Sequence, residues 1–286
     1  MTPLLRAELE RVLQNHFGDS RSVSLLTRRE SPYRSSHNLE ELEVELDDGT
    51  SLSVMLKAVG NDALSTAARS AKPSFLYDPM REIATYRRLL PEVDLDTAVC
   101  YGTSIEPAEG RFWLFLEKVD ATELYDVGEF EAWEAAARWL AGFHSRFARD
   151  GERWCAPCRL LRFGPEYFRM WPRRAAAFGD HLAGRTAALQ WLVSRYEGVV
   201  DRLLALPMAV LHGEFYASNI LVGRGEGELR ICPIDWEMTA WGPAPLDVAA
   251  LCSGKWTEED RRAMALEYRS SLEAEVLAIP SEDDLL

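Results

Sequence analysis

The pattern of apolar and polar residues changes about 120 residues into the chain. In the first part, residues 39–46 alternate between apolar and acidic side chains, which is the period of a half-buried strand. The turn Asp47–Gly49 and the apolar segment 51–59 complete a predicted β-hairpin. The same reasoning predicts further strands and helices. The strands are at 23–29, 99–102 and 112–116, and the helices are at 1–17 and 80–90.

Beyond residue 120, helical periodicity dominates. Apolar residues spaced three and four apart predict helices at 129–149, 165–182, 184–205, 244–252 and 257–278. Three short apolar runs predict strands at 209–211, 219–222 and 229–234. The change from a β-rich to an α-rich pattern indicates an α+β protein with two lobes and a cleft between them. We place the boundary between residues 118 and 119, so that the lobes are 1–118 and 119–286.

Composition narrows the class of protein. Among 286 residues, 46 are acidic and 32 are basic, which gives a net charge of −14. Nucleic-acid binders depend on clustered Lys and Arg, so we expect no nucleic acid as partner. No apolar run approaches the roughly 20 residues of a membrane-spanning helix, and the N-terminal segment lacks a signal-peptide pattern. We therefore expect a cytoplasmic protein that does not bind a membrane.

The segment 210–222 carries the most chemical information. An apolar run leads into His212 and Glu214, and Asn219 follows five residues after Glu214. Asp235 stands at the end of the apolar run that begins at residue 229. Taken singly, each of these residues is ordinary, because acids and amides are common in solvated loops. Together, Asn219 and Asp235 supply the oxygen ligands that Mg²⁺ prefers. Glu214 can orient or deprotonate a hydroxyl, so the spacing predicts phosphoryl transfer from a nucleoside triphosphate.

Three segments in order carry a family resemblance. The segments 212–221 (HGEFYASNIL), 234–237 (IDWE) and 242–249 (GPAPLDVA) resemble the H-G-D-x-x-x-x-N, I-D-W-E and G-x-x-x-x-D-[LVI]-A motifs of the aminoglycoside phosphotransferase and choline kinase family. The resemblance covers nearly the whole chain. It implies a protein-kinase-like fold with a small β-rich N-terminal lobe and a larger helical C-terminal lobe. In this family His212 supports the catalytic loop, and Asp247 ties that loop to the next helix or merely caps a surface helix.

The resemblance also implies roles in the first lobe. Lys57 is the phosphate-binding lysine, with Glu82 as its ion-pair partner, although an edge-strand lysine and a solvated helix acid are the plain alternatives. Ser35 and Ser36 offer backbone and hydroxyl donors to the phosphates. Backbone groups of Glu117–Val119 meet the base. The cofactor is then Mg²⁺ with ATP or GTP.

The acceptor is less defined by the sequence. The resemblance implies a small-molecule hydroxyl, and the acidic charge of the chain makes a cation one candidate. An aminoglycoside, choline or another amino alcohol, an amino-acid-like alcohol and a sugar all stay open. The helical insertion at 125–205 is rich in aromatic residues, which form either an amine-binding pocket or a core.

One residue departs from the family motif, because Glu214 replaces the usual Asp. The extra methylene moves the carboxylate by up to about 1.5 Å. A misplacement of about 1 Å can lower a rate by ~10²-fold. We expect an active small-molecule kinase, because phosphoryl transfer depends mainly on positioning and charge neutralisation. The alternative is a kinase-like pseudoenzyme that binds nucleotide as a regulatory or interaction module.

A second motif points elsewhere. The segment 154–158 (WCAPC) resembles the redox motif of thioredoxin-like proteins. That chemistry needs a strand before the motif and a helix starting at it, whereas here a helix and a polar turn precede Cys155. A zinc site built on Cys155 and Cys158 lacks a second CxxC or HxxxH. We therefore expect neither role.

Overall fold

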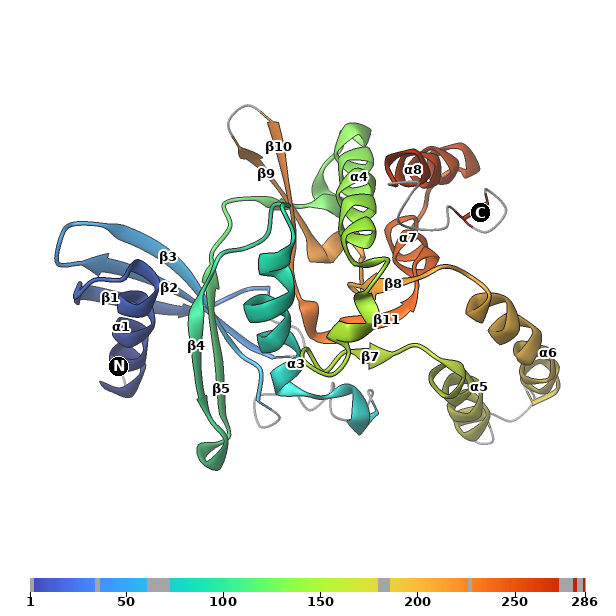
Figure 1. The fold of residues 1–286 in the computed structure, drawn as a ribbon, viewed down its shortest axis with the longest axis horizontal. Helices are drawn as coiled ribbons and strands as arrows, with labels where there is room; N and C mark the ends of the chain where they lie inside the picture. Colours follow the sequence, from blue (N-terminus) through green and yellow to red (C-terminus); the bar gives the residue numbers. More distant parts are fainter. Residues whose placement is uncertain are drawn as a thin grey trace. The chain divides into compact units, whose positions relative to one another are not determined.

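The computed structural model describes residues 3–33, 37–60, 73–179, 186–225, 228–272, 280, 281 and 285. The chain divides into two compact units (Figure 1). The sheet unit comprises Met1–Val127, Pro157–Arg159 and Ser218–Met238. The helical unit comprises Gly128–Ala156, Leu160–Ala217 and Thr239–Leu286. The segment 218–238 thus belongs to the sheet unit, although it lies C-terminal to the predicted boundary at 118/119. That boundary divides the chain by function into two lobes, and this division stays a prediction.

The sheet unit is built on a five-stranded antiparallel sheet with the order β1-β2-β3-β5-β4. The side chains of Leu42, Val44 and Leu46 are at most 2% exposed, because the alternation along β2 turns every second residue to the core. The predicted strands and the hairpin are confirmed. The strands are β1 (Val23–Glu30), β2 (Asn38–Leu46), β3 (Ser51–Ala58), β4 (Cys100–Glu106) and β5 (Arg111–Glu117).

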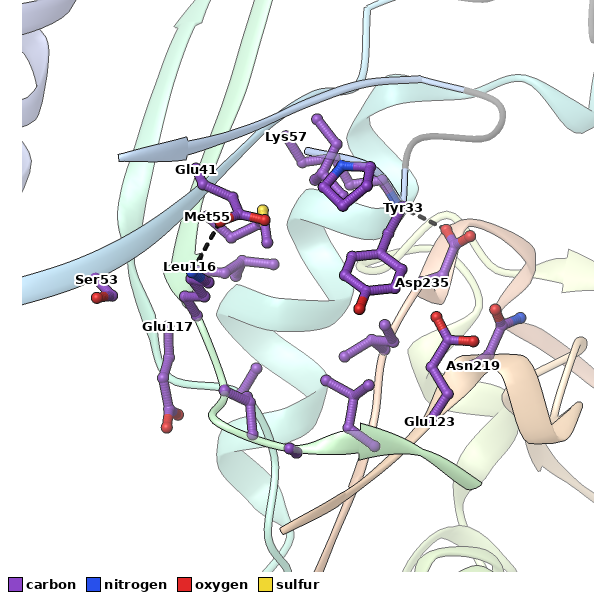
Figure 2. A pocket seen from close by; sticks show the side chains of 18 of the residues that line it. Tyr33, Glu41, Ser53, Met55, Lys57, Leu116, Glu117, Glu123, Asn219 and Asp235 are labelled. Atoms are coloured by element: carbon purple, nitrogen blue, oxygen red, sulfur yellow. Dashed lines mark hydrogen bonds and ion pairs between the residues drawn. The ribbon is translucent and has the colours of Figure 1, made fainter. Parts of the chain in front are cut away.

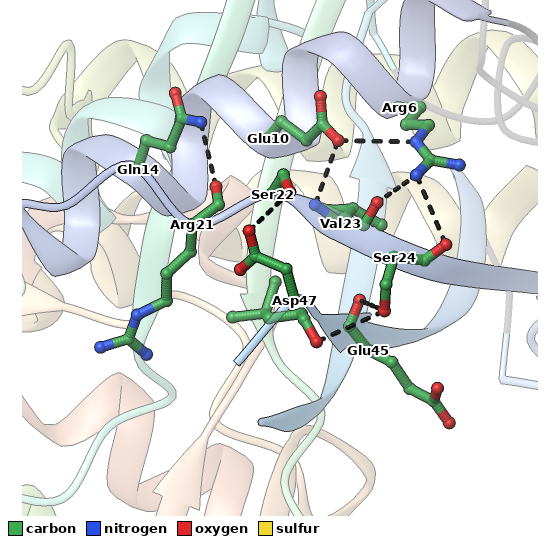
Figure 3. A network of polar contacts seen from close by, with 10 residues as sticks. Arg6, Glu10, Gln14, Arg21, Ser22, Val23, Ser24, Glu45 and Asp47 are labelled. Atoms are coloured by element: carbon green, nitrogen blue, oxygen red, sulfur yellow. Dashed lines mark hydrogen bonds and ion pairs between the residues drawn. The ribbon is translucent and has the colours of Figure 1, made fainter. Parts of the chain in front are cut away.

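Helix α1 (Pro3–Phe17) covers one face of this sheet. Its buried side chains Leu5, Leu9, Val12 and Leu13 recur every three or four residues and join the apolar core of the sheet. Polar contacts fasten the helix to the chain around β1 (Figure 3). Among them, Gln14 donates to the carbonyl oxygen of Arg21 at 2.9 Å.

The predicted helix at 80–90 is confirmed, but its winding changes along its length. It begins as α3 (Pro79–Ala84), with Asp78 accepting a hydrogen bond from the N–H of Met80 as N-cap. It continues as a π-helical turn over Thr85–Leu89 and a 3₁₀ turn over Leu90–Glu92. Pro91 lies in that last turn, and the helix ends one residue after it.

A small second sheet completes the sheet unit. Its strand order is β10-β9-β6, with β6 at Thr122–Glu123, β9 at Ile220–Gly225 and β10 at Glu228–Pro233. Strands β9 and β10 correspond to the predicted apolar runs. The sequence did not predict β6, because two residues are too short to show a periodic pattern.

The helical unit contains the predicted helices α4 (Phe130–Phe147), α5 (Pro165–Gly179), α6 (Thr186–Leu204), α7 (Pro245–Leu251) and α8 (Glu258–Ser271). A three-stranded sheet joins them, with β7 at Leu161–Arg162, β8 at Met208–Leu211 and β11 at Ala240–Pro243. Its core is aromatic, with Trp139 stacked on both Phe143 and Phe215. In the described part of the chain, no helix combines the length and apolar character needed to cross a bilayer.

Candidate active site

A cavity of about 750 Å³ lies within the sheet unit (Figure 2). Strands β1 to β3, helix α3, the segment after β5 and the ends of β9 and β10 contribute to its wall. The structure brings six of the predicted site residues together around this cavity. They are Lys57, Glu82, Glu117, Val119, Asn219 and Asp235. Ser35 and Ser36 lie outside the described residues.

Lys57 lies at the centre of a buried ion-pair cluster. Its Nζ is 2.7 Å from Oε1 of Glu82 and 2.6 Å from Oδ1 of Asp235. Burial acts to lower the pKa of Lys57, but Asp235, Glu82 and Glu237 outweigh it and hold that pKa above its usual range. The edge-strand alternative is wrong, because β3 lies between β2 and β5. Lys57 is therefore a charged residue in the wall of the cavity, and its ammonium group contacts two carboxylates.

Glu82 comes from α3 and is only 2% exposed. Burial raises the pKa of its carboxyl group to about 7, while the charge of Lys57 acts in the opposite direction. The alternative of a solvated helix acid is therefore wrong. No described residue forms a hydrogen bond with Oε2 of Glu82, which is buried. A buried acceptor without a donor lowers the stability of the fold. The Lys57 ammonium, which donates to Oε1 of the same carboxyl group, offsets this loss.

The backbone around Asp235 is held in an uncommon conformation. Asp235 has φ +64°, in the left-handed region that costs a non-glycine residue roughly 1 kcal/mol. Next to it, the N–H of Ile234 donates to the carbonyl oxygen of Asn219 at 2.9 Å. This bond makes the segments carrying Asn219 and Asp235 direct neighbours. The oxygen-bearing side chains that the sequence grouped therefore come from adjacent backbone in the structure.

Arg81, which the sequence analysis missed, ties α3 to the segment that carries Asp235. The side chain is 3% exposed and donates to the carbonyl oxygens of Leu76, Arg159 and Glu237 at 2.9, 2.9 and 2.8 Å. Glu237 follows Asp235 by two residues. Arg81 therefore fixes the helix of Glu82 against the segment of Asp235. No sequence signal marks it, since arginine is common on helices.

We expect Arg81→Met to lower the free energy of unfolding by about 3 kcal/mol, because three buried or partly buried carbonyl groups lose a charged donor. Urea unfolding measures this loss. Arg87→Met is the matched control, because Arg87 is exposed on the same helical segment. Equal stability of the two variants would contradict the structural role of Arg81.

Residues Glu117–Val119, at the end of β5 and just after it, line the cavity. The N–H of Glu117 donates to Val99 and the N–H of Lys118 donates to Ser53, at 2.8 and 3.1 Å. The side chain of Glu117 forms a bidentate pair with Arg230, at 2.6 and 2.8 Å, which lowers the pKa of that carboxyl group. By contrast, no described residue forms a hydrogen bond with the backbone of Val119. Its peptide group is thus open to a ligand in the cavity.

Glu41 is a second cavity residue without a sequence signal. Along β2 it alternates with apolar residues as Glu43 does, yet it is 3% exposed. Lys118 pairs with it at 2.8 Å and Arg29 at 2.8 Å, and the hydrogen bond from Lys118 is the main cause that lowers the Glu41 pKa (Figure 2). Glu123 also lines the cavity, and Figure 2 shows it beside Asn219.

The loop with His212 and Glu214 belongs to the helical unit. The carboxylate of Asp247 accepts the N–H groups of His212 and Gly213 at 2.7 and 2.9 Å. His212 is fully buried, and its Nδ1 accepts the N–H of Glu214 at 3.3 Å. Gly213 has φ +88°, which a residue with a Cβ rarely adopts. Asp247 therefore ties the loop to α7, and the alternative of a surface helix cap is wrong.

An aromatic group on α5 lies within electrostatic reach of Glu214. Burial raises the pKa of Tyr167 to about 12, and the charge of Glu214 contributes to that shift. The Tyr167 ring stacks on Phe163 with centroids 4.0 Å apart and meets Trp171 edge-on at 6.0 Å. One aromatic residue of the predicted insertion, Tyr167, is thus close enough to Glu214 to feel its charge.

Comparison with known proteins decides the family. The sequence model described as "Phosphotransferase enzyme family" matches residues 52–280, which is more than half of the chain. The chain belongs to this family. It is therefore an enzyme of phosphoryl transfer. No curated protein sequence matches the chain significantly.

Solved structures of this type share the fold at low sequence identity. Spectinomycin phosphotransferase in complex with ADP and spectinomycin superposes with a TM-score of 0.59 and 15% identity, covering 93% of this chain and 80% of that one. Macrolide 2'-phosphotransferase of Brachybacterium faecium superposes with a TM-score of 0.58 and 15% identity, covering 94% of this chain and 84% of that one. Plasmodium vivax ethanolamine kinase superposes with a TM-score of 0.57 and 12% identity, covering 91% of this chain and 70% of that one. The predicted protein-kinase-like α+β fold is confirmed.

The cysteines of this phosphotransferase do not resemble a redox pair. Cys155 and Cys158 are free thiols, 7% and 0% exposed. Burial raises the pKa of Cys155, whereas a redox-active cysteine needs a lowered one. The Sγ of Cys158 donates to the carbonyl oxygen of Ala84 at 3.8 Å. The described residues also contain no group of three or more His, Cys, Asp or Glu that could hold a metal ion.

We expect Cys155 to be alkylated at about pH 8 at least ~10-fold more slowly in the native protein than in urea, because the thiolate is the reactive form. Mass spectrometry of peptides after timed treatment with iodoacetamide measures the two rates. Similar rates in the two states would show that Cys155 is an accessible thiolate and would reopen the redox alternative.

Proposed function

We propose that the protein transfers the γ-phosphoryl group of ATP or GTP to a hydroxyl group of a small molecule. The observation that carries this proposal is the contact of Lys57 with both Glu82 and Asp235 in the wall of a 750 Å³ cavity. A buried ammonium between two carboxylates is held in a fixed position for the phosphates of a nucleotide. The family supplies the reaction class.

In this proposal Asn219 and Asp235 hold Mg²⁺. The ligand set fits this ion, because both side chains present oxygen and a backbone hydrogen bond from Ile234, next to Asp235, to Asn219 holds their segments together. Mg²⁺ is usually held by one or two protein ligands together with phosphate oxygens, which agrees with so small a set. When bound, the ion neutralises phosphate charge. Asp235 also contacts Lys57, so one carboxylate positions both cations.

The nucleotide base meets the segment after β5. Val119 offers the open peptide group there, while Met55, Leu116 and Leu221 provide apolar surface for a flat ring. The role of Glu117 lies in its pair with Arg230, which orients the segment. Ser35 and Ser36 stay predicted phosphate contacts. We propose 1–118 as the nucleotide-binding lobe and 119–286 as the lobe that binds the acceptor.

The acceptor is bound near Glu214. Its carboxylate accepts the hydrogen bond of the acceptor hydroxyl, which then attacks the γ-phosphorus in line with the leaving oxygen. His212 fixes the Glu214 backbone through their hydrogen bond. The similar structures include phosphotransferase complexes with kanamycin and with spectinomycin, and an ethanolamine kinase. We therefore propose an amine-bearing alcohol as acceptor and the cytoplasm, which supplies nucleotide and Mg²⁺, as location.

A product screen tests this function. The protein is incubated with ATP or GTP and Mg²⁺ against aminoglycosides, macrolides, amino alcohols and sugars, and products are analysed by mass spectrometry. Transfer appears as a gain of one phosphate on an acceptor together with release of nucleoside diphosphate. If nucleotide and Mg²⁺ raise the melting temperature but no acceptor gains phosphate, the second candidate function is favoured. That candidate is a nucleotide-binding regulatory module, and the presence of Glu214 instead of Asp supports it.

A further inference from the structure

We propose that Tyr268 is a positioning residue that acts on Glu214 through a buried chain of hydrogen bonds. This inference rests on the proposed function, in which Glu214 receives the hydrogen bond of the acceptor. All residues of this hydrogen-bonded chain belong to the helical unit. They come from α8, α4, α7 and the loop after β8, which are far apart in sequence.

The outer half of the chain connects three helices. The hydroxyl of Tyr268 on α8 lies 2.9 Å from Nδ1 of His144 on α4. The other ring nitrogen of His144, Nε2, lies 3.3 Å from Oδ2 of Asp247 on α7. These three side chains are at most 1% exposed. A buried polar network of this kind is rigid when every member has a partner, and costly when one partner is lost.

The direction of each bond follows from its chemistry. A carboxylate can only accept hydrogen bonds, so His144 donates to Asp247 through Nε2–H. A neutral imidazole with a proton on Nε2 has an acceptor at Nδ1, and therefore the Tyr268 hydroxyl donates to it. Burial and the charge of Asp247 raise the pKa of Tyr268 above its usual range, so the hydroxyl keeps its proton. Tyr268 thereby selects the tautomer of His144.

The inner half of the chain ends at Glu214. Asp247 binds the N–H groups of His212 and Gly213 with its two oxygens, which fixes both peptide planes. His212 Nδ1 then accepts the N–H of Glu214 at 3.3 Å. Glu214 carries its carboxylate one methylene further from the backbone than an Asp would. The backbone of the loop therefore has to be held in place if the carboxylate is to reach the hydroxyl.

Removal of the Tyr268 hydroxyl affects the whole chain. Nδ1 of His144 becomes a buried acceptor without a donor, so the ring is free to exchange tautomers or rotate. In the other tautomer, Asp247 loses a donor and a lone pair of Nε2 faces its oxygen. The two peptide planes that Asp247 holds then become less restrained. The expected effect is loosening of the loop without loss of the nucleotide cavity, which belongs to the sheet unit.

The test uses Tyr268→Phe and two readouts. We expect hydrogen exchange at the amides of Gly213 and Glu214 to become about 10-fold faster than in the unmodified protein. We expect kcat to fall by about 10-fold with an unchanged KM for nucleotide, because positioning of the hydroxyl is affected and nucleotide binding is not. The matched control is Tyr101→Phe, which removes a phenol hydroxyl from a half-buried tyrosine on β4 and should alter neither readout.

A second variant makes the test independent of one substitution. His144→Gln keeps an N–H near the Nε2 position but removes the acceptor for Tyr268. If the two residues act through one chain, the double variant should be no slower than the worse single variant. Additive losses, unchanged loop exchange, faster exchange throughout the helical unit, or faster loop exchange with unchanged kcat would each overturn the proposal. Hydrogen exchange needs no acceptor, so it tests the connection from Tyr268 to the loop separately from the proposed function.

Discussion

Lys57→Met should reduce kcat/KM for phosphoryl transfer by about 10³-fold, since it removes the cation nearest the phosphates in the proposed site. The loss has a structural part as well. Without the ammonium, Glu82 and Asp235 confront each other as uncompensated carboxylates, and breaking such a buried pair typically costs about 3–5 kcal/mol. We therefore expect lower stability and weaker nucleotide binding together.

Steady-state kinetics and urea unfolding of Lys57→Met measure the two parts. Lys57→Arg should not restore activity, because its bulkier planar fork cannot take the place of a compact ammonium between Glu82 and Asp235. The matched control is Lys255→Met, which removes an exposed lysine from the helical unit. If Lys57→Met keeps at least half of the activity, Lys57 is not the phosphate-binding cation.

Glu214→Gln should lower kcat by about 10³-fold and leave the KM for nucleotide nearly unchanged. The amide has the size of the carboxylate but cannot accept a proton or draw the hydroxyl hydrogen toward it. Because Glu214 lies in a loop held by Asp247 and His212, the fold should persist in the variant. Single-turnover kinetics with saturating nucleotide measure the chemical step.

Glu214→Asp tests whether the length of the side chain matters. The family motif has Asp here, but this loop is held in place, so a shorter side chain leaves the carboxylate up to about 1.5 Å short of the hydroxyl. We expect kcat to fall by about 10²-fold. Glu131→Gln, at an exposed position of α4, serves as control for both variants. Full turnover by Glu214→Gln would remove Glu214 from the mechanism and favour another base.

Much of the fold could be predicted from the sequence because its elements carry strong local signals. The alternation at 39–46 and the turn Asp47–Gly49 specify a hairpin, and the helices of the second part repeat apolar residues every three or four positions. The elements that were missed, β6, β7 and β11, are two to four residues long. Elements of that length form because neighbouring strands offer hydrogen-bond partners, which no local pattern reveals.

The candidate site likewise contains residues that the sequence predicted and residues that it did not. Motif spacing singled out Asn219 and Asp235, because a short apolar strand carries each residue to the same edge of a sheet. Arg81, Glu41 and Tyr268 had no comparable signal. Each becomes informative only through partners from distant elements, such as the carbonyl of Glu237 for Arg81.

By itself, the sequence determined the class of chemistry and a list of candidate residues for it. Only the tertiary structure decided which of those residues meet. Lys57 contacts Glu82 across 25 residues of chain and Asp235 across 178, and Tyr268 reaches His144 across 124. Such contacts depend on how elements pack, since local periodicity fixes only which face of a strand or helix is buried. The carboxylates around Lys57 keep it charged although it is buried, and the hydrogen bonds of His144 with Asp247 and Tyr268 select its tautomer. No residue pattern specifies either of these.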